Sequence, residues 1–485
     1  MKKLFIIAGL SLTVATFNNC ATNPVTGKKQ VVFMSEEQEI AMGQEADPQI
    51  IAQYGLYEDS DLQAFVSQKG KEMAAISHRP NLNYQFRILD SEVLNAFAVP
   101  GGYVYFTRGI MAHFNDEAQM AGVLGHEIGH IAARHSVEQQ RNQMLGSLGI
   151  IAGVIINPEL ARFAETASQG LGLLMLKFGR DAERESDQLG VEYSTKIGYD
   201  AKQMAAFFTT LERQSQAAGA AELPDFLSTH PNPGDRNATV QKLAADWQAK
   251  QNLTNPQIKR NEYLRRIDGI IYGEDPKGGF REGNMFYHPV LKFQFPIPSG
   301  WNYQNTPSRV QMAPSDGNAL MFLTLAQGAS LNEAANNMVQ ANKLSVIESG
   351  QRTVNGFNAL AVVADVIQDP NQQQATAPIR TLSYFIQDGN SIYMITGLSA
   401  TQNFNNYINY FRTTMEGFKR LTDQSKLNKK PLRVRIKTTT SSTTLEQALR
   451  SQNMPSSRFN ELAILNGMQL NQSLPSGTSY KILAE

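Results

Sequence analysis

The sequence predicts an α+β protein of several domains: a mainly helical region with a small sheet, a second α+β domain, and a short module of two strands and two helices. Three observations lead to this prediction. The chain has 485 residues, enough for about three domains at roughly 150 residues each. Helical periodicity dominates residues 35–267. A Gly/Pro-rich linker, residues 268–284, then precedes a region of strand and hairpin patterns.

Composition and charge limit the class of protein. The chain is 42% hydrophobic and 18% charged, which is typical of an ordered globular protein. Lys and Arg total 44, and Asp and Glu also total 44, so no overall charge attracts a nucleic acid. We therefore expect no nucleic-acid partner.

Residues 1–19 have the pattern of an export signal. Two lysines precede the apolar stretch "LFIIAGLSLTVATF", which is too short to span a bilayer comfortably. The only cysteine of the chain, Cys20, follows, at the place where a bacterial lipoprotein is cleaved and acylated. The three residues before it, Phe-Asn-Asn, differ from the usual cleavage site. Acylation of Cys20 and an ordinary signal peptide with an incidental cysteine therefore both stay open.

The helical region follows a polar tether, residues 20–34. Ser35 and the acidic residues after it indicate the start of a helix. Residues 82–90 and 95–109 are rich in strand-forming residues, and a Pro-Gly-Gly turn divides the second of these segments. Residues 144–176 contain two apolar segments shorter than the roughly 20 residues that cross a membrane. We expect a buried helical hairpin there; a hydrophobic lid or a membrane-surface contact is the alternative.

The motif "HEIGH" lies within a long helical pattern. Residues four apart on a helix lie about 40° apart in rotation and about 6 Å along the axis, so His126 and His130 can reach one zinc ion. Glu127 lies about 100° from His126, where its carboxylate can act on a metal-bound water rather than on the metal. A base beside a zinc-polarised water hydrolyses peptide bonds. Histidines buried in a helical core are the alternative, which we consider weaker.

Three glycines around this motif, Gly122, Gly125 and Gly129, indicate that another element packs very close to the helix, since each costs about 1 kcal/mol of helix propensity. His135 is expected to lie outside the site. It is nine residues, or about 900°, from His126, so it would face away if the helix continued. A structural or surface role is expected for it.

A carboxylate on a second helix usually completes a zinc site that has two histidines and a glutamate. Glu183 and Asp187 are four residues apart and share a helix face, so one could bind the metal while the other orients a ligand histidine. Glu185 is expected to face solvent. A solvated acidic face is the alternative for the whole cluster. Further along, His230 lies in a loop; it could form a turn, or approach the metal or a transition-state oxyanion.

Five segments together resemble the HtpX / CAAX-prenyl-endopeptidase family of zinc metallopeptidases, and are most similar to its BepA-like branch of periplasmic lipoproteins. They are "CATNPVTGKKQ", "NAFAVPGGYVYFTRG", "LGHEIGHIAARH", "RDAERESDQLG" and "THPNPGDR". The resemblance covers about half of the chain. It implies a gluzincin-type domain in which one zinc ion is held by His126, His130 and Glu183. It also implies that Glu127 is the general base and that Asp187 lies behind a ligand histidine.

The resemblance implies further roles. Asn95 and Ala96 would lie on an edge strand along which the substrate backbone binds. His230 would approach the zinc and hold the enzyme inactive. Arg236 matches a position of the same motif, and we expect a catalytic role for it. Ser186 stands where the family usually has Ala, a change from which we expect little consequence.

The rest of the chain does not follow this family, whose BepA-like branch carries helical repeats. Residues 285–422 predict an α+β domain of unassigned role, with turns at Asp316-Gly317 and Asn355-Gly356. Residues 431–485 predict a strand, two helices and a strand, and they resemble a LysM module. That resemblance implies binding to peptidoglycan.

Together these expectations describe a zinc-dependent endopeptidase of the bacterial cell envelope that degrades misfolded or stalled envelope proteins. Its partners would be protein or peptide substrates, the outer-membrane assembly machinery, and peptidoglycan. It would lie in the periplasm, held at the outer membrane through Cys20. The alternative is a chaperone, scaffold or peptidoglycan-anchored binding protein with a latent zinc site.

Overall fold

The computed structural model describes residues 20–27, 29–31, 34–137, 139, 149–151, 154–156, 160, 178–218, 225–230, 236–367 and 377–485. The expected export signal lies outside these residues, as does most of the apolar segment 144–176. Within the described ranges no helix is both long and apolar enough to cross a membrane.

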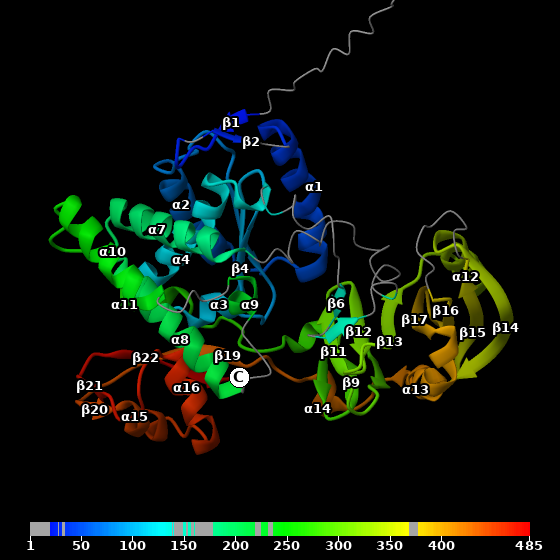
Figure 1. Ribbon diagram of the computed structural model, residues 1–485. Helices are drawn as coiled ribbons and strands as arrows, with labels where there is room; N and C mark the ends of the chain where they lie inside the picture. Colours follow the sequence, from blue (N-terminus) through cyan, green and yellow to red (C-terminus); the bar gives the residue numbers. More distant parts are fainter. Residues whose placement is uncertain are drawn as a thin grey trace, which may run out of the picture.

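The helical region is built around a small sheet (Figure 1). Its first half consists of α1 (Glu36–Tyr54), α2 (Ser60–Ala74), β3 (Gln85–Leu89), β4 (Ala96–Val99), β5 (Tyr103–Thr107), α3 (Arg108–His113) and α4 (Glu117–Ala132). The sheet order is β3-β5-β4, with β3 parallel and β4 antiparallel to β5. The strand β4 is therefore an edge strand, as the resemblance implied.

The described part of this region also contains α7 (Arg180–Lys196), α8 (Lys202–Ala218), α9 (Asp225–Thr229), α10 (Arg236–Lys250) and α11 (Arg260–Arg266). The helix α4 packs closely against α7 because both carry glycines at the contact. A Cβ added at Gly125 would lie 3.0 Å from the Cα and carbonyl oxygen of Gly190. One added at Gly122 would lie 2.7 Å from the Cβ of Met204 in α8. The close packing predicted from the glycines is confirmed.

The apolar segment 144–176 was expected to form a helical hairpin. Its described residues instead include two short antiparallel strands, β6 (Gly149–Ile151) and β7 (Val154–Ile156). The helix expectation is wrong for these residues. The β-branched isoleucines and valine at these positions suit an extended backbone, and a short apolar run does not distinguish a strand from a buried helix.

The middle of the chain contains two antiparallel sheets. A four-stranded sheet, in the order β18-β10-β9-β8, contains β8 (Phe280–Glu282), β9 (Met285–His288), β10 (Phe293–Pro296) and β18 (Lys419–Arg420). A seven-stranded sheet, in the order β11-β12-β13-β17-β16-β15-β14, contains β11 (Asn302–Thr306), β12 (Arg309–Ala313), β13 (Ala319–Leu325), β14 (Leu344–Val354), β15 (Phe357–Val366), β16 (Ile379–Asp388) and β17 (Ser391–Ala400).

One helix covers each face of the seven-stranded sheet. In β15, Leu360 and Val362 pack in one core with α12 (Leu331–Ala341), while Ala359 and Ala361 belong to the core that contains residues of α13 (Phe404–Glu416). This alternation is the period-2 side-chain pattern of a strand buried on both faces. The strand β6 of the preceding region lies beside β12.

The chain ends in a module that contains β19 (Arg433–Thr438), α15 (Leu445–Ser451), α16 (Phe459–Leu465) and β22 (Ser479–Ala484), with β19 antiparallel to β22. Two shorter strands, β20 (Thr443–Thr444) and β21 (Ser473–Leu474), also pair, and α14 (Gln424–Leu427) precedes the module. The order of strand, helix, helix and strand is the predicted one. The likeness to a LysM module stays a prediction.

This terminal module packs on the helical region, against α8 and α11 (Figure 1). Val434 and Leu462 belong to the same hydrophobic core as Phe114. The buried Lys481 donates hydrogen bonds from Nζ to the carbonyl oxygens of Ala112, at 2.8 Å, and Phe114, at 2.7 Å. Module and helical region therefore share one core.

Candidate metal centre

The first helix of the site, α4, is buried along its whole length. The side chain of Asp116 caps it by accepting a hydrogen bond of 2.8 Å from the backbone nitrogen of Gln119. A helix that begins here places His126 and His130 one turn apart on the side that faces α7. The sequence motif therefore becomes a pair of imidazoles directed at a second helix.

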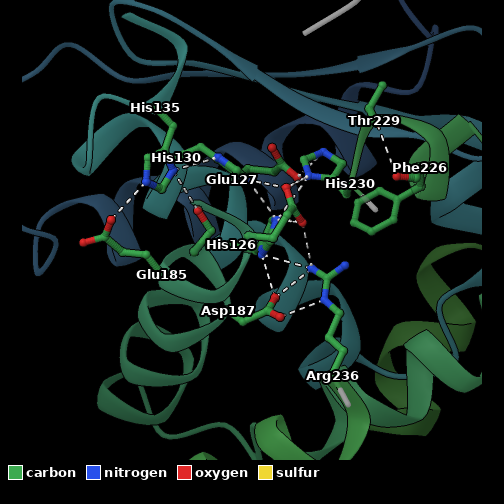
Figure 2. Close-up of polar contacts among 12 residues, drawn as sticks. His126, Glu127, His130, His135, Glu185, Asp187, Phe226, Thr229, His230 and Arg236 are labelled. Atoms are coloured by element: carbon green, nitrogen blue, oxygen red, sulfur yellow. Dashed lines mark hydrogen bonds and ion pairs between the residues drawn. The ribbon is translucent and has the colours of Figure 1, made fainter. Parts of the chain in front are cut away.

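Four side chains meet at one point between these helices: His126, His130, Glu183 and His230. One donor atom from each lies within 4.8 Å of all the others, and all four residues are fully buried. Figure 2 shows the three histidines around this point, with Glu127 beside them. The predicted geometry, with α4 against α7 and Glu183 facing both histidines of the motif, is confirmed.

The distances fit a metal ion. The Nε2 atoms of His126 and His130 are 3.0 Å apart, and they lie 3.6 Å and 3.4 Å from the carboxylate oxygens of Glu183. Ligand atoms at about 2.0–2.2 Å from a tetrahedral zinc ion are about 3.3–3.5 Å from one another. The two nitrogens and the carboxylate of Glu183 therefore surround a point at which zinc fits.

The protonation states of these groups also suit a metal. Burial lowers the pKa of His130 well below its usual value, so the ring is neutral. Burial alone would raise the pKa of Glu183, but His230, His130 and His126 outweigh it and lower this pKa well below its usual value. A neutral imidazole and an ionised carboxylate are the forms that bind metal ions.

Glu127 is the second carboxylate at the centre. Its side chain is fully buried, and neither carboxylate oxygen has a hydrogen-bond partner among the described residues. Its Oε1 lies 3.7 Å from Nε2 of His230. Burial raises the pKa of Glu127, because an ionised carboxylate without donors is poorly solvated. Such a group readily accepts a proton from a nearby water.

Asp187 and Arg236 lie behind the histidine pair. Asp187 accepts a hydrogen bond of 2.9 Å from Nδ1 of His126. Arg236 donates to both oxygens of the same carboxylate, from Nε and Nη2, at 2.7 Å each. Nη2 of Arg236 also lies 3.4 Å from Oε2 of Glu183. Arg236 therefore contacts both Asp187 and Glu183.

His230 follows the short helix α9 and completes the group of four. Its Nδ1 lies 3.0 Å from Oε1 of Glu183 and 3.3 Å from Nε2 of His126. Burial alone would lower the pKa of His230, but the carboxylates of Glu183 and Glu127 outweigh it and raise this pKa. The residues between His230 and Arg236, 231–235, are outside the described part of the chain.

The segment that carries His230 also reaches the edge strand. The ring of Phe226 stacks on that of His230, with centroids 4.6 Å apart. The backbone nitrogen of Phe226 donates a hydrogen bond of 3.1 Å to the carbonyl oxygen of Leu94, just before β4. Next to Leu94, Asn95 has a buried Oδ1 without a hydrogen-bond partner in the described residues, and Ala96 is fully buried.

Two side-chain directions were predicted wrongly, those of His135 and Glu185. The helix α4 ends at Ala132, and Arg134 adopts a left-handed conformation with φ of 62°. The chain therefore turns back, and Nδ1 of His135 lies 3.0 Å from Nδ1 of His130. Glu185 does not simply face solvent, because its Oε2 lies 3.1 Å from Nε2 of His135. The sequence carries no glycine that would have signalled this turn.

Ser186 also has a contact that the sequence did not suggest. Its Oγ lies 3.2 Å from Nδ1 of His135, so an alanine at this position would lack that contact. Phe178 covers the same group, because its ring stacks on His130 with centroids 4.0 Å apart. Spacing alone selects neither residue: Ser186 lies on α7 and Phe178 just before it, and the packing of α7 on α4 brings them to His135 and His130.

Two histidines and a glutamate from two helices, a second carboxylate beside them and an edge strand are the arrangement typical of zinc metallopeptidases of the HExxH class. Comparison with known proteins agrees: residues 60–244 match the sequence model of Peptidase family M48. Residues 60–244 are therefore similar to the peptidases of that family, which use zinc.

Several curated proteins are similar to the chain. A beta-barrel assembly-enhancing protease of Yersinia pestis is 28% identical over 267 residues, which cover 52% of each chain. The protein of the same name from Escherichia coli K12 is 28% identical and covers 46% of this chain and 47% of its own. The mitochondrial metalloendopeptidase OMA1 of Arabidopsis thaliana is 30% identical and covers 37% and 36%. The chain spans about half the length of the first two relatives, and less of the third.

Proposed function

We propose that the protein is a zinc-dependent endopeptidase of the bacterial cell envelope that degrades misfolded or stalled envelope proteins and is gated by His230. One observation carries the proposal of catalysis. The buried carboxylate of Glu127 has no hydrogen-bond donor among the described residues and lies beside the donor group of His126, His130 and Glu183. A structural metal site has no need for an additional free carboxylate of this kind.

In the proposed mechanism His126, His130 and Glu183 hold one zinc ion. Bound zinc supplies Lewis-acid chemistry, acidifying a water and polarising the scissile carbonyl. Glu127 takes one proton from the attacking water while the oxygen of that water bonds to the carbonyl carbon. Glu127 then delivers the proton to the nitrogen of the leaving amine as the C–N bond breaks. Asp187 keeps the proton of His126 on Nδ1, so that Nε2 faces the metal position.

We place the substrate along β4. An extended peptide can add to the free edge of this strand by main-chain hydrogen bonds, which would bring its scissile bond near α4. Asn95 and Ala96 begin this edge. The buried Oδ1 of Asn95 then has a natural partner in a backbone N–H of the substrate.

The gate is the segment of α9 and His230. It contributes a fourth donor to the metal group through His230, and its Phe226 nitrogen bonds to the carbonyl of Leu94 at the start of the substrate edge. A substrate that reaches the metal position and lies along β4 must displace His230 from the metal group and Phe226 from Leu94. We therefore assign the closed form to the structure described here, and an open form, with α9 moved away, to the active enzyme.

The cellular role rests on the relatives. Two of them are named as beta-barrel assembly-enhancing proteases, so we propose envelope proteins as substrates and the outer-membrane assembly machinery as a partner. The export signal of residues 1–19 and acylation at Cys20 would place the protein in the periplasm at the outer membrane. Binding of residues 431–485 to peptidoglycan is proposed on their likeness to a LysM module.

A protease assay on casein tests the proposal. The wild type, Glu127→Gln and His230→Ala are compared with equal zinc content. Glu127→Gln should bind zinc and lose turnover, and His230→Ala should cleave faster than the wild type. Cleavage by Glu127→Gln at the wild-type rate would exclude the mechanism.

The same donor group favours a second candidate, a chaperone or scaffold with a latent zinc site, because His230 already completes the group of four. That candidate predicts that neither the wild type nor His230→Ala cleaves protein, although both bind zinc.

A further inference from the structure

We propose that His135 and Glu185 are positioning residues that fix the ring of His130 for metal binding. The inference rests on the proposed function in one respect, which is that His130 binds the zinc ion through Nε2. It concerns a second set of contacts, on the side of His130 that faces away from the metal position.

The turn that brings His135 to His130 is held by ion pairs. After α4 ends, Arg134 has the left-handed φ of 62°, which a residue other than glycine seldom adopts. Its Nε donates a hydrogen bond of 3.0 Å to Glu39, and its Nη2 donates one of 2.9 Å to the carbonyl of Met34. Glu39 is itself buried and paired with Arg79. The unusual backbone at Arg134 is therefore stabilised from α1.

The turn produces a row of polar groups behind His130. Nδ1 of His130 lies 3.0 Å from Nδ1 of His135, and Nε2 of His135 lies 3.1 Å from Oε2 of Glu185. Figure 2 shows His135 between the other two side chains. His135 is 5% exposed, so solvent does not replace these contacts.

The positions of the protons follow from the acceptors. Nε2 of His130 must carry no proton if it is to bind a metal, so its proton is on Nδ1. That proton needs an acceptor, and the unprotonated Nδ1 of His135 is within reach. His135 then carries its own proton on Nε2, where the carboxylate of Glu185 accepts it. In this arrangement His130 donates to His135, and His135 donates to Glu185.

The arrangement parallels the one behind the other histidine. His126 donates from Nδ1 directly to the carboxylate of Asp187. His130 reaches a carboxylate of the same helix, Glu185, through one intervening imidazole. The helix α7 therefore supplies Glu183 to the metal group and a carboxylate behind each histidine. Groups in this position orient a ligand histidine and increase its basicity.

Zinc affinity of the full-length chain tests the inference. We would measure the zinc dissociation constant by competition with a chromophoric chelator for the wild type, His135→Ala, Glu185→Ala and Glu185→Gln. The two alanine variants should bind zinc about 10–100-fold more weakly. Glu185→Gln should recover most of the affinity, because its amide oxygen can still accept the proton of His135. Asp181→Ala is the matched control, since this carboxylate on the same helix is fully exposed.

Two further measurements separate positioning from stability. The absorption spectrum of the Co²⁺-substituted protein should change in His135→Ala, because the ring of His130 is no longer fixed. The thermal unfolding midpoint of the metal-free variants should stay close to that of the wild type. Wild-type affinity and spectrum in both alanine variants would overturn the inference, as would an affinity loss that Glu185→Gln does not recover.

The outcome for the proposed function is read separately. A wild type that binds zinc but cleaves no protein overturns the proposed function, while the affinities still decide the role of His135 and Glu185. A wild type that binds no zinc overturns both.

Discussion

Asp187 accepts a hydrogen bond of 2.9 Å from Nδ1 of His126, and Arg236 fixes the same carboxylate with two hydrogen bonds of 2.7 Å. A bidentate Arg–carboxylate pair holds both oxygens in one plane. The imidazole of His126 is therefore held in one orientation, with Nε2 directed at Glu183, 3.6 Å away. Residues that never touch the metal position thus determine how its ligands point.

The first prediction follows from this relationship. Asp187→Asn replaces Oδ2, the acceptor of Arg236 Nε, with an amide group that donates, and it removes the negative charge behind His126. We expect the zinc dissociation constant to rise about 10–100-fold, as for other groups that orient a ligand histidine. Competition with a chelator measures this change, and Asp181→Asn, on the exposed side of the same helix, is the control. An affinity equal to that of the wild type would show that Asp187 does not orient His126.

The second prediction concerns the N-terminus of α4 and pH. Burial raises the pKa of Asp116 from 3.8 to about 6. Because this folded-state pKa is higher than the unfolded one, the stabilising effect of the protonated form is complete below pH 3.8 and is lost as pH rises through about 6. At neutral pH the native state holds a buried charge, a penalty of about 3 kcal/mol at most.

Asp116→Asn should remove this penalty while keeping a good helix cap. The free energy of unfolding should match that of the wild type near pH 4 and exceed it by about 1–3 kcal/mol at pH 8. Urea unfolding at the two pH values measures the difference. A variant that is less stable than the wild type at pH 8 would show that the Asp116 charge is favourable, through Arg260 and the helix N-terminus.

The site shows which relationships the sequence could predict. Residues four apart on one helix share a face whatever surrounds them, so the pairs His126–His130 and Glu183–Asp187 followed from spacing alone. The glycines of α4 predicted a close neighbour, and α7 is that neighbour. Spacing alone could not show which acidic residue of α7 contacts which histidine, because several acidic side chains on this helix point in different directions.

What could not be predicted depends on long-range contacts. His135 was expected to continue the helix, and its return to His130 depends on a left-handed Arg134 that Glu39 holds from about 95 residues earlier in the sequence. Spacing carries no information about such a contact. The strands β6 and β7 were missed for a related reason: an apolar run of few residues is compatible with helix and strand, and its neighbours decide.

The third prediction concerns the terminal module. Nζ of Lys481 donates to the carbonyls of Ala112, Phe114 and Leu465, and it is fully buried. Lys481→Met keeps most of the side-chain length but leaves three buried carbonyls without this donor. We expect a loss of about 2–4 kcal/mol in the free energy of unfolding, since each unsatisfied buried acceptor costs about 1–3 kcal/mol and removal of the buried amine offsets part of this.

The same contact predicts that residues 431–485 are needed for a stable helical region, because Ala112 and Phe114 lie just before α4. A chain that lacks these residues should unfold at a lower temperature and bind zinc more weakly. Calorimetry of the full chain should show one transition for the helical region and the module. Separate transitions, or a truncated chain with unchanged midpoint and zinc affinity, would indicate that the module is an independent appendage.

The fourth prediction tests the contact between α4 and α7. Gly125→Ala places a Cβ about 3.0 Å from the Cα and carbonyl oxygen of Gly190, which are backbone atoms that cannot rotate away. The gain of about 1 kcal/mol in helix propensity is therefore outweighed by an overpacking cost of about 1–3 kcal/mol. The two helices must separate slightly, and Glu183 then moves relative to His126 and His130.

We expect Gly125→Ala to weaken zinc binding more than it lowers stability, because the donor atoms of the site come from both sides of this contact. The zinc dissociation constant and the free energy of unfolding of the metal-free chain would be measured together. Gly278→Ala is the control, since an added Cβ there meets nothing within 4 Å and the residue lies outside both helices. A Gly125→Ala variant that is more stable than the wild type and binds zinc equally well would contradict the prediction. It would show that the site does not require this close contact between α4 and α7.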